Sequence, residues 1–417
     1  MSRAFDLSKC ARPNILQLKP YRCARDDYKD DGTNILLDAN ENAYGPGLSL
    51  TREGKIQAQQ TNGQGQTSEP EIDFLGLHRY PDPHQIDLKQ LLCNLRNTNI
   101  HTAKLLTPSN LFVGVGSDEA IDALLRCFCA PGRDQILTCP PTYGMYSVSA
   151  QVNDISIVEV ALDVERNFQL RPDAINETLS SNPSIKMVYI CSPGNPTANL
   201  IAKSDIQRVL EHPTWNGIVV VDEAYIDFAA EGSSLAQWVT EFPNLVVMQT
   251  LSKAFGLAGI RLGAAFTSPE IATLLNSLKA PYNISSPTSA VAQAALTAAN
   301  LANMKRNLGK IIAQRNRLLT ELPKIPGIGR LRGGTESNFL LYEILDKPVN
   351  QGGKPCNAVA LAAYQALAES KGVVVRFRGK EFGCEGCLRI TVGTEGEVEK
   401  FLKEIGVVLG EIYKGRS

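Results

Sequence analysis

One lysine in this sequence lies between residues that could hold an anion. Lys253 follows Ser252 and precedes Arg261. An apolar run at 245–248 comes just before the stretch that contains them, 250–263, which we call the lysine segment. A strand that ends in small and hydroxylated residues is typical of a site at a strand terminus. A hydroxyl and a guanidinium can bind one anion together, and a lysine buried near other cations becomes a neutral, nucleophilic amine. Lysine is usually a surface residue, so the interpretation depends on what the rest of the chain supplies.

Further polar side chains follow other apolar runs. Asp222 and Tyr225 come after the run at 217–221, Asn195 follows the run at 186–191, and Tyr143 follows the run at 135–139. Helical stretches, such as 203–212, separate several of these runs. Alternation of this kind predicts an α/β fold with a largely parallel sheet, in which ligands meet the carboxyl ends of the strands. We therefore expect these side chains to converge, although each could instead cap a helix or close a local turn.

Three more segments could contact a ligand. Gly116, Ser117 and Asp118 form a turn between a strand and a helix, which aims backbone N–H groups at a phosphate or simply caps the helix. A turn rich in Asn, Gly and Pro at 38–46 could present Asn40 and Tyr44, or be a plain β-turn. The proline that follows Tyr80 restricts its backbone.

The lysine segment resembles that of fold-type I pyridoxal-phosphate aminotransferases. The shared pattern is T-x-S-K-x-x-x-x-x-G-x-R-x-G at 250–263. By this resemblance Lys253 would bind pyridoxal 5'-phosphate covalently and move a proton, and Asp222 would face the pyridine nitrogen. The remaining cofactor contacts would be Asn195 and Tyr225 at the phenolic oxygen, Tyr143 on the ring, and Gly116, Ser117, Asp118, Ser252 and Arg261 around the phosphate.

A larger set of motifs is similar to the histidinol-phosphate aminotransferases. It comprises L-D-A-N-E-N-A-Y-G-P at 37–46, R-Y-P-D at 79–82, G-S-D-E at 116–119, D-E-A-Y-I-D-F at 222–228, the lysine segment, and C-L-R-I-T-V-G-T at 387–394. The resemblance implies amino transfer between histidinol phosphate and 2-oxoglutarate in histidine biosynthesis. Arg376 and Arg389 would bind the substrate phosphate or the glutamate carboxylates, assisted by Asn40 and Tyr44. Tyr80 would come from the neighbouring subunit of a homodimer.

The chain departs from the family pattern at two places. The family usually has S-P-N-N-P-T-G where this chain has S-P-G-N-P-T-A at 192–198, which changes the loop around Asn195. A polar, Gln- and Gly-rich insertion at 49–70 lies between two site motifs and has the composition of a flexible surface segment.

Composition narrows the class of protein. The 417 residues carry a formal net charge of -1, which gives no reason to expect a nucleic-acid partner. No apolar run approaches the length of a membrane span, and the first residues do not form a secretory signal. Ten scattered cysteines favour a reducing compartment, so we expect a cytoplasmic protein. Cys384 and Cys387 form one isolated C-x-x-C, which does not by itself require a metal.

The order of elements predicts three parts. Residues 1–75 would be an N-terminal arm with the insertion, 76–322 a large cofactor-binding α/β domain, and 323–417 a small α+β domain, with the boundary at the proline- and glycine-rich stretch 323–329. In the small domain we expect strands near 339–342, 373–377 and 388–392, and helices near 358–370 and 397–409.

Other functions remain open at this point. An aromatic aminotransferase or an amino-acid-phosphate decarboxylase of the same fold would share the lysine and the aspartate, because fold does not decide the substrate. A non-catalytic protein of this fold that binds ligands or regulates expression would be expected to lack the lysine or to carry an added nucleic-acid-binding domain.

Overall fold

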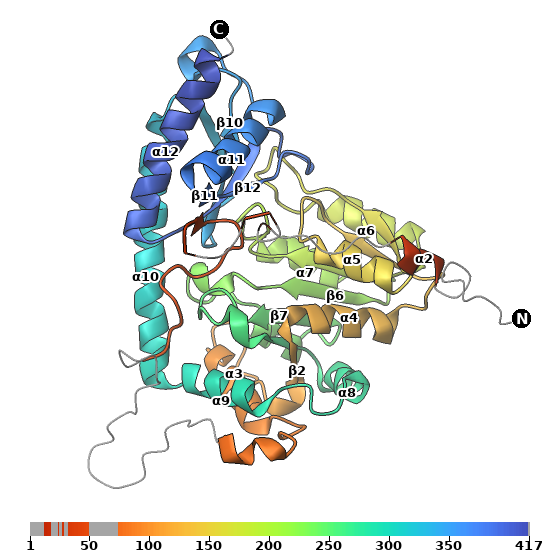
Figure 1. Ribbon diagram of the computed structural model, residues 1–417. Helices are drawn as coiled ribbons and strands as arrows, with labels where there is room; N and C mark the ends of the chain where they lie inside the picture. Colours follow the sequence, from red (N-terminus) through yellow and green to blue (C-terminus); the bar gives the residue numbers. More distant parts are fainter. Residues whose placement is uncertain (1–11, 18–23, 25–26, 29–31, 50–73, 416–417) are drawn as a thin grey trace, which may run out of the picture.

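The computed structural model describes residues 12–17, 24, 27–28, 32–49 and 74–415. The expected insertion lies mostly outside these residues. Figure 1 shows a large sheet with helices on both faces, and a smaller group of strands and helices at one end of the molecule. The family of α/β folds expected from the sequence is thus the one observed.

The large sheet has seven strands in the order β2-β8-β7-β6-β5-β3-β4. Strands β3 to β7 are parallel to their neighbours within this group, whereas β8 runs antiparallel to both β2 and β7. The strands are β2 Leu111–Val115, β3 Gln135–Thr138, β4 Ser156–Glu159, β5 Ile185–Cys191, β6 Ile218–Asp222, β7 Leu245–Thr250 and β8 Leu262–Phe266. The strand that follows the lysine segment, β8, therefore runs opposite to the strand that leads into that segment, β7.

Both faces of this sheet are buried, which explains why its strands are continuous apolar runs. Val220 points to one face, and its neighbours Val219 and Val221 point to the other. One face is covered by α4 Gly116–Phe128, α5 Met145–Val152 and α8 Pro269–Leu278, and the other by α3 Ile86–Arg96, α6 Pro172–Ser181 and α7 Lys203–Leu210. The sheet is thereby a rigid base for the residues at its carboxyl edge.

Two helices lead from the large sheet to the small one. Helix α9, Ser286–Ala295, is followed by α10, Ala298–Glu321, which runs along the side of the molecule and packs beside α12, Glu395–Lys414 (Figure 1). The long helix ends just before the proline at 323, as the sequence indicated.

The small sheet is antiparallel, in the order β12-β13-β10-β9. Its strands are β9 Ile328–Arg332, β10 Phe339–Ile344, β12 Arg376–Phe377 and β13 Cys387–Thr391, and α11 Asn357–Lys371 packs against it. Sequence analysis assigned the start of β9 to the domain boundary and missed this strand, because its glycines and flanking prolines have the composition of a turn.

One expected strand belongs to two sheets. The run at 373–377 divides into β11, Val373–Val374, which pairs in parallel with β1, Ile35–Leu36, and β12, which pairs with β13. Composition shows an extended run but not its partners, so the expectation of one strand was wrong in this respect. The pairing ties the segment before the 38–46 turn to the C-terminal part of the chain.

The shorter elements complete the description. They are the helix α2 Pro13–Leu16 and the 3-10 turns Phe74–His78, Pro108–Asn110, Ile226–Phe228, Ala236–Thr240, Ala258–Ile260, Leu322–Lys324 and Val349–Gln351. Among the described residues, no helix is long and apolar enough to cross a membrane.

Candidate active site

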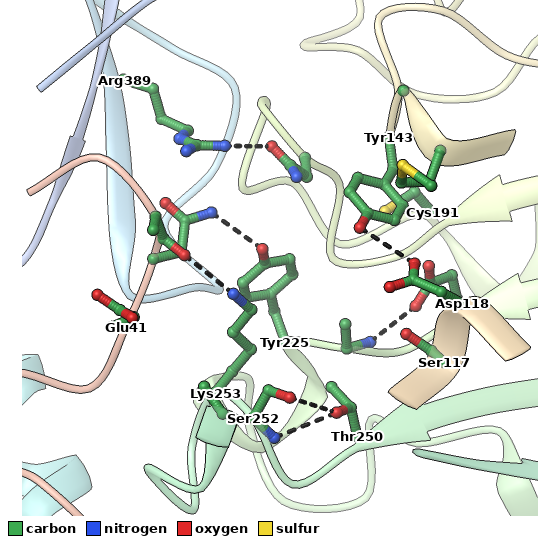
Figure 2. A pocket seen from close by; sticks show the side chains of 18 of the residues that line it. Glu41, Ser117, Asp118, Tyr143, Cys191, Tyr225, Thr250, Ser252, Lys253 and Arg389 are labelled. Carbon is green, nitrogen blue, oxygen red and sulfur yellow. Dashed lines mark hydrogen bonds between the residues drawn. The ribbon is translucent and has the colours of Figure 1, made fainter. Parts of the chain in front are cut away.

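A cavity of about 430 Å³ lies at the carboxyl edge of the large sheet, beneath the small one. It is in the size range of small-molecule and cofactor sites. The expected site residues that line it are Asn40, Ser117, Asp118, Tyr143, Asn195, Asp222, Tyr225, Ser252, Lys253, Arg261, Arg376 and Arg389. Figure 2 shows how several of them face one another. Strands β5, β6 and β7 are parallel neighbours, so their carboxyl ends lie at the same edge of the sheet. Asn195, Asp222 and Lys253 lie at or just after these ends and therefore line the same cavity.

Lys253 is partly buried at the floor of the cavity. Its Nζ donates to the carbonyl oxygen of Ala39 at 3.0 Å (Figure 2). Burial, reinforced by the Arg389 guanidinium, lowers the pKa of Lys253 to about 8. A much larger share of this lysine is therefore a neutral amine near neutral pH than is true of an exposed lysine.

Asp222 is a buried carboxyl group at the end of β6. Its Oδ2 accepts from the Tyr146 hydroxyl at 2.7 Å, and its Oδ1 accepts from the Ala224 backbone N–H at 3.1 Å. Burial raises the pKa of Asp222 to about 6, against the lowering effect of the Tyr146 hydrogen bond. A cation placed beside this group in the cavity would favour its charged form.

Tyr225 and Asn195 lie at the boundary between the two sheets. The Tyr225 hydroxyl accepts from Asn40 Nδ2 at 2.9 Å, and Asn195 Oδ1 accepts from Arg389 Nη1 at 2.7 Å. Burial raises the pKa of Tyr225 to about 12, so it is a neutral donor near pH 7. Asn40 also accepts from Thr391 on β13, and this bond connects the 38–46 turn to the small sheet.

The start of α4 makes a second, polar end of the cavity. Gly116 has φ +74, and a Cβ there would lie 2.7 Å from Arg261 Nη2, so glycine allows the guanidinium to approach the helix. Arg261 Nη2 contacts Asp118 Oδ2 at 3.4 Å, and the Tyr143 hydroxyl donates to Asp118 Oδ1 at 3.3 Å. The first backbone N–H groups of a helix have no partners within it, and such groups together with a hydroxyl and a guanidinium, here those of Ser252 and Arg261, are chemically suited to an anion.

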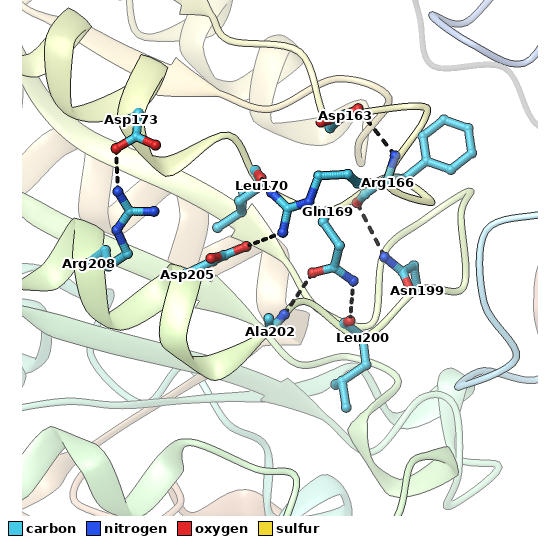
Figure 3. A network of polar contacts seen from close by, with 11 residues as sticks. Asp163, Arg166, Gln169, Leu170, Asp173, Asn199, Leu200, Ala202, Asp205 and Arg208 are labelled. Carbon is cyan, nitrogen blue, oxygen red and sulfur yellow. Dashed lines mark hydrogen bonds and ion pairs between the residues drawn. The ribbon is translucent and has the colours of Figure 1, made fainter.

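The loop after β5, which has the sequence S-P-G-N-P-T-A, carries Asn195 at the edge of the cavity. A Cβ at Gly194 would lie 2.2 Å from Thr197 Oγ1, so the glycine makes room for this threonine inside the loop. Gln169 holds the far end of the loop, since its side chain donates to the Leu200 carbonyl at 3.0 Å and accepts from the Ala202 N–H at 2.9 Å (Figure 3). Asn195 thereby faces the cavity.

Three expected residues do not line the cavity of the single chain. Gly116 lies just behind the lining residues. Tyr44 lies outside the cavity, and its ring packs beneath Lys310 Nζ at 5.3 Å from the centroid. Tyr80 is 81% exposed and stacks on Tyr282 with ring centroids 4.5 Å apart. The roles expected of Tyr44 and Tyr80 stay predictions.

Sequence analysis missed several residues of the cavity. Arg378 lines it beside Arg376, and Tyr146 supports Asp222 from beneath. The signal for Arg378 was present, since it is two residues from Arg376 and alternate residues of a strand share a face. Tyr146 gave no signal, because it is far from Asp222 in sequence. Cys384 and Cys387 are buried free thiols that pack against Leu341.

Comparison with known proteins agrees with this geometry. The family model of aminotransferase class I and II matches residues 33–405. The histidinol-phosphate aminotransferase of Schizosaccharomyces pombe is 53% identical over 98% of this chain and 99% of its own length, and that of Saccharomyces cerevisiae is 46% identical over 96% of both.

A solved structure has the same fold. It is the histidinol-phosphate aminotransferase from Sinorhizobium meliloti in complex with pyridoxal-5'-phosphate, with a TM-score of 0.76, 20% identity and coverage of 96% of this chain and 97% of that one. Together with the match to the family model and the identity to the yeast proteins, the likeness means that this chain belongs to the histidinol-phosphate aminotransferases of the class I and II aminotransferase family.

Proposed function

We propose that this chain catalyses the reversible transfer of an amino group between histidinol phosphate and 2-oxoglutarate in L-histidine biosynthesis, with pyridoxal 5'-phosphate bound to Lys253. The observation that carries the proposal is one cavity in which the Lys253 amine, the buried Asp222 carboxyl and the guanidinium groups of Arg376 and Arg389 meet. Such a cavity suits an amine whose other end carries an anion.

The residues present fit pyridoxal phosphate. An anion site at the start of α4 and a buried carboxyl group at Asp222 lie in the same cavity as Lys253, as the phosphate, the pyridine nitrogen and the aldehyde of this cofactor require. A protonated ring nitrogen would offset the cost of burying the Asp222 charge. Ser117, Asp118, Ser252 and Arg261 would hold the phosphate group, and Tyr143 would pack on the ring.

Bound pyridoxal phosphate supplies a ring that withdraws electrons from the substrate carbon beside the nitrogen. Within this site, the Lys253 amine would hold the cofactor and would act as the base that takes the proton from that carbon, since its Nζ lies in the same cavity as the substrate-binding arginines. Its lowered pKa makes the amine a base near neutral pH. Tyr225 and Asn195 would donate to the phenolic oxygen, and Asp222 would keep its charge beside the ring nitrogen.

The Arg376 and Arg389 guanidinium groups would hold the anionic end of each substrate. Arg389 is 4% exposed, and burial together with Arg378 lowers its pKa to about 9, so it remains a cation at neutral pH. A guanidinium group can donate two hydrogen bonds to either a phosphate or a carboxylate, so one site can serve both half-reactions.

Tyr80 supports a homodimer in which the two active sites share residues. The tyrosine projects from the chain and makes no contact with the cavity of its own chain, although the resemblance to the family gives it a role at the cofactor. We therefore infer that Tyr80 completes the site of a second copy.

The proposal is tested by a comparison of amino donors. Purified protein with pyridoxal phosphate and 2-oxoglutarate is expected to form glutamate faster from histidinol phosphate than from phenylalanine, tyrosine or threonine phosphate. Turnover of the aromatic amino acids alone would instead indicate an aromatic aminotransferase, and release of carbon dioxide from threonine phosphate would indicate a decarboxylase.

The cofactor is tested by absorbance. The wild-type protein is expected to be yellow and to lose this band on treatment with borohydride, while Lys253→Ala is expected to lack the band and the activity. A wild-type protein without the band would contradict the assignment of pyridoxal phosphate.

A further inference from the structure

Three guanidinium groups share one face of the small sheet. Arg376 on β12 lies directly opposite Arg389 on β13, so their side chains leave the sheet on the same side. Arg378 is two residues beyond Arg376, and its N–H donates to the Cys387 carbonyl at 2.9 Å, which continues the pairing with β13. All three arginines line the cavity. The row therefore concentrates positive charge where substrate would bind.

Within the part of the chain that the structure describes, Arg378 is the member of this row that has a carboxylate partner. Its Nη1 donates to Glu381 Oε1 at 2.8 Å, and the two side chains are 23% and 27% exposed. Arginine has five N–H donors, and this contact uses one of them. Arg378 Nε and Glu381 Oε2 are buried and have no hydrogen-bond partner among the described residues, and the same is true of Arg389 Nε. The pair is thus held in place but incompletely bonded.

A phosphate group and a single carboxylate group differ in charge and in the number of terminal oxygens. A phosphate monoester carries a charge of about -1.5 to -2 near pH 7 and has three terminal oxygens, whereas a carboxylate has one charge and two oxygens. Two arginines can satisfy a carboxylate. The second negative charge of a phosphate matches a third guanidinium group, and Glu381 balances the charge of Arg378 when the bound anion is a carboxylate.

We propose that Arg378 binds the phosphate group of the phosphorylated substrate and contributes little to the binding of glutamate, with Glu381 as a positioning residue that holds its guanidinium beside Arg376 and Arg389. This inference rests on the proposed function, because it needs a phosphorylated and an unphosphorylated substrate at one site. Arg378 is then a determinant of specificity in addition to Arg376 and Arg389.

The test compares the KM values of the two half-reactions. Arg378→Gln is expected to raise the KM for histidinol phosphate by about 10- to 100-fold, the usual loss for a hydrogen bond to a charged group, and to change the KM for glutamate by less than about threefold. Arg378→Lys, which keeps the charge but loses the fork, is expected to be intermediate. Arg330→Gln is the matched control, because Arg330 is an exposed arginine of the same sheet that does not line the cavity.

A charge-neutral double variant separates contact from net charge. Arg378→Gln with Glu381→Gln removes one positive and one negative charge, so the net charge of the Arg378–Glu381 pair is unchanged. The KM for histidinol phosphate is expected to stay raised. A return to the wild-type value, or an equal rise in both KM values for Arg378→Gln, would overturn the proposal.

Failure of this inference is distinct from failure of the proposed function. A wild-type protein that turns over histidinol phosphate, and whose Arg378→Gln variant keeps both KM values, contradicts only the role of Arg378. The cofactor absorbance of each variant reports whether the site is folded.

Discussion

At the scale of single residues, burial changes the chemistry of the groups in the cavity. Lys253 and Asp222 are ordinary residue types whose pKa values are moved toward each other by loss of water, to about 8 and about 6. Titratable groups whose pKa values are shifted by burial within one cavity are typical of active sites. The two pKa values can be measured separately.

The lowered pKa of Lys253 predicts how fast the cofactor-free protein takes up pyridoxal phosphate. Only the neutral amine attacks an aldehyde. The rate should therefore rise as the pH approaches about 8 and level off above it, whereas an exposed lysine would keep gaining reactivity toward pH 10.5. Stopped-flow absorbance over a pH series measures the profile, with Lys310→Ala as a control for an exposed lysine. A rate that still rises steeply well above pH 8 would contradict the assigned pKa.

The raised pKa of Asp222 predicts the pH dependence of stability without cofactor. A carboxyl group whose folded pKa is higher than its unfolded pKa stabilises the protein at low pH, and this contribution is lost as the pH rises through the folded pKa. Between the ordinary aspartate pKa of 3.8 and the raised pKa of about 6, the loss is roughly 3 kcal/mol at about 1.4 kcal/mol per pH unit. Denaturant unfolding of cofactor-free wild type and Asp222→Asn should differ by this amount across that range.

Asp222→Asn should also reduce transamination. Loss of one member of a buried charged pair typically costs about 3 kcal/mol or more, which corresponds to a loss of roughly 100-fold in kcat. Steady-state kinetics at saturating pyridoxal phosphate measure this effect. If the stability of wild type and of Asp222→Asn changed equally with pH and kcat were the same for both proteins, Asp222 would not be a charged group beside the cofactor.

At the scale of elements, the loop after β5 depends on contacts from a distant segment. The side chain of Gln169 bonds to both Leu200 and Ala202, and Asn199 Nδ2 donates to the Phe168 carbonyl (Figure 3). These bonds fix the end of the loop that carries Asn195. The loop could therefore keep its site residue while its sequence changed around it.

Gln169→Ala should loosen this loop. It removes two hydrogen bonds worth about 1 kcal/mol each, so the apparent Tm should fall and the KM for both substrates should rise, with a smaller change in kcat. Thermal unfolding and steady-state kinetics measure the two effects. The control is Gln207→Ala, because the Gln207 side chain on α7 donates to the side chain of Glu211, which directly follows this helix. An equal effect of both variants would show that the loop does not depend on Gln169.

At the scale of the whole molecule, the active site joins segments from both ends of the chain. Asn40 precedes the large sheet in sequence, Lys253 ends one of its strands, and Arg389 lies on the small sheet. Movement of the small sheet relative to the large one would change the distance from Arg389 to Lys253, so both substrate affinity and proton transfer depend on how the two sheets are held.

The exposed Tyr80 predicts complementation between inactive variants. Tyr80→Ala and Lys253→Ala should each have low activity as pure proteins. If Tyr80 acts in the site of a second copy, unfolding and refolding the two variants together should restore activity, since a mixed dimer contains one site with both residues. Leu274→Ala, an exposed apolar residue elsewhere, is the control partner. A mixture no more active than its components, or a monomer by sedimentation, would contradict the shared site.

Local sequence was enough to predict the fold class and to name most of the side chains that line the cavity. Apolar runs that end in polar turns show the strands of a buried parallel sheet, and the parallel arrangement alone brings Asn195, Asp222 and Lys253 together. The apolar runs and the turns that follow them are local features, so the sequence indicates them even when the neighbours of each strand in the sheet are unknown.

Other features of the fold and the site depend on contacts between distant segments, so only the tertiary structure shows them. Examples are the division of 373–377 between two sheets, the antiparallel direction of β8 and the hydrogen bond from Tyr146 to Asp222. Each depends on contacts between residues far apart in sequence, and no local sequence pattern indicates such contacts. The pKa values of Lys253 and Asp222 also belong to this class, because burial is a property of the assembled cavity. Local composition specifies which side chains are available, and packing determines their environment.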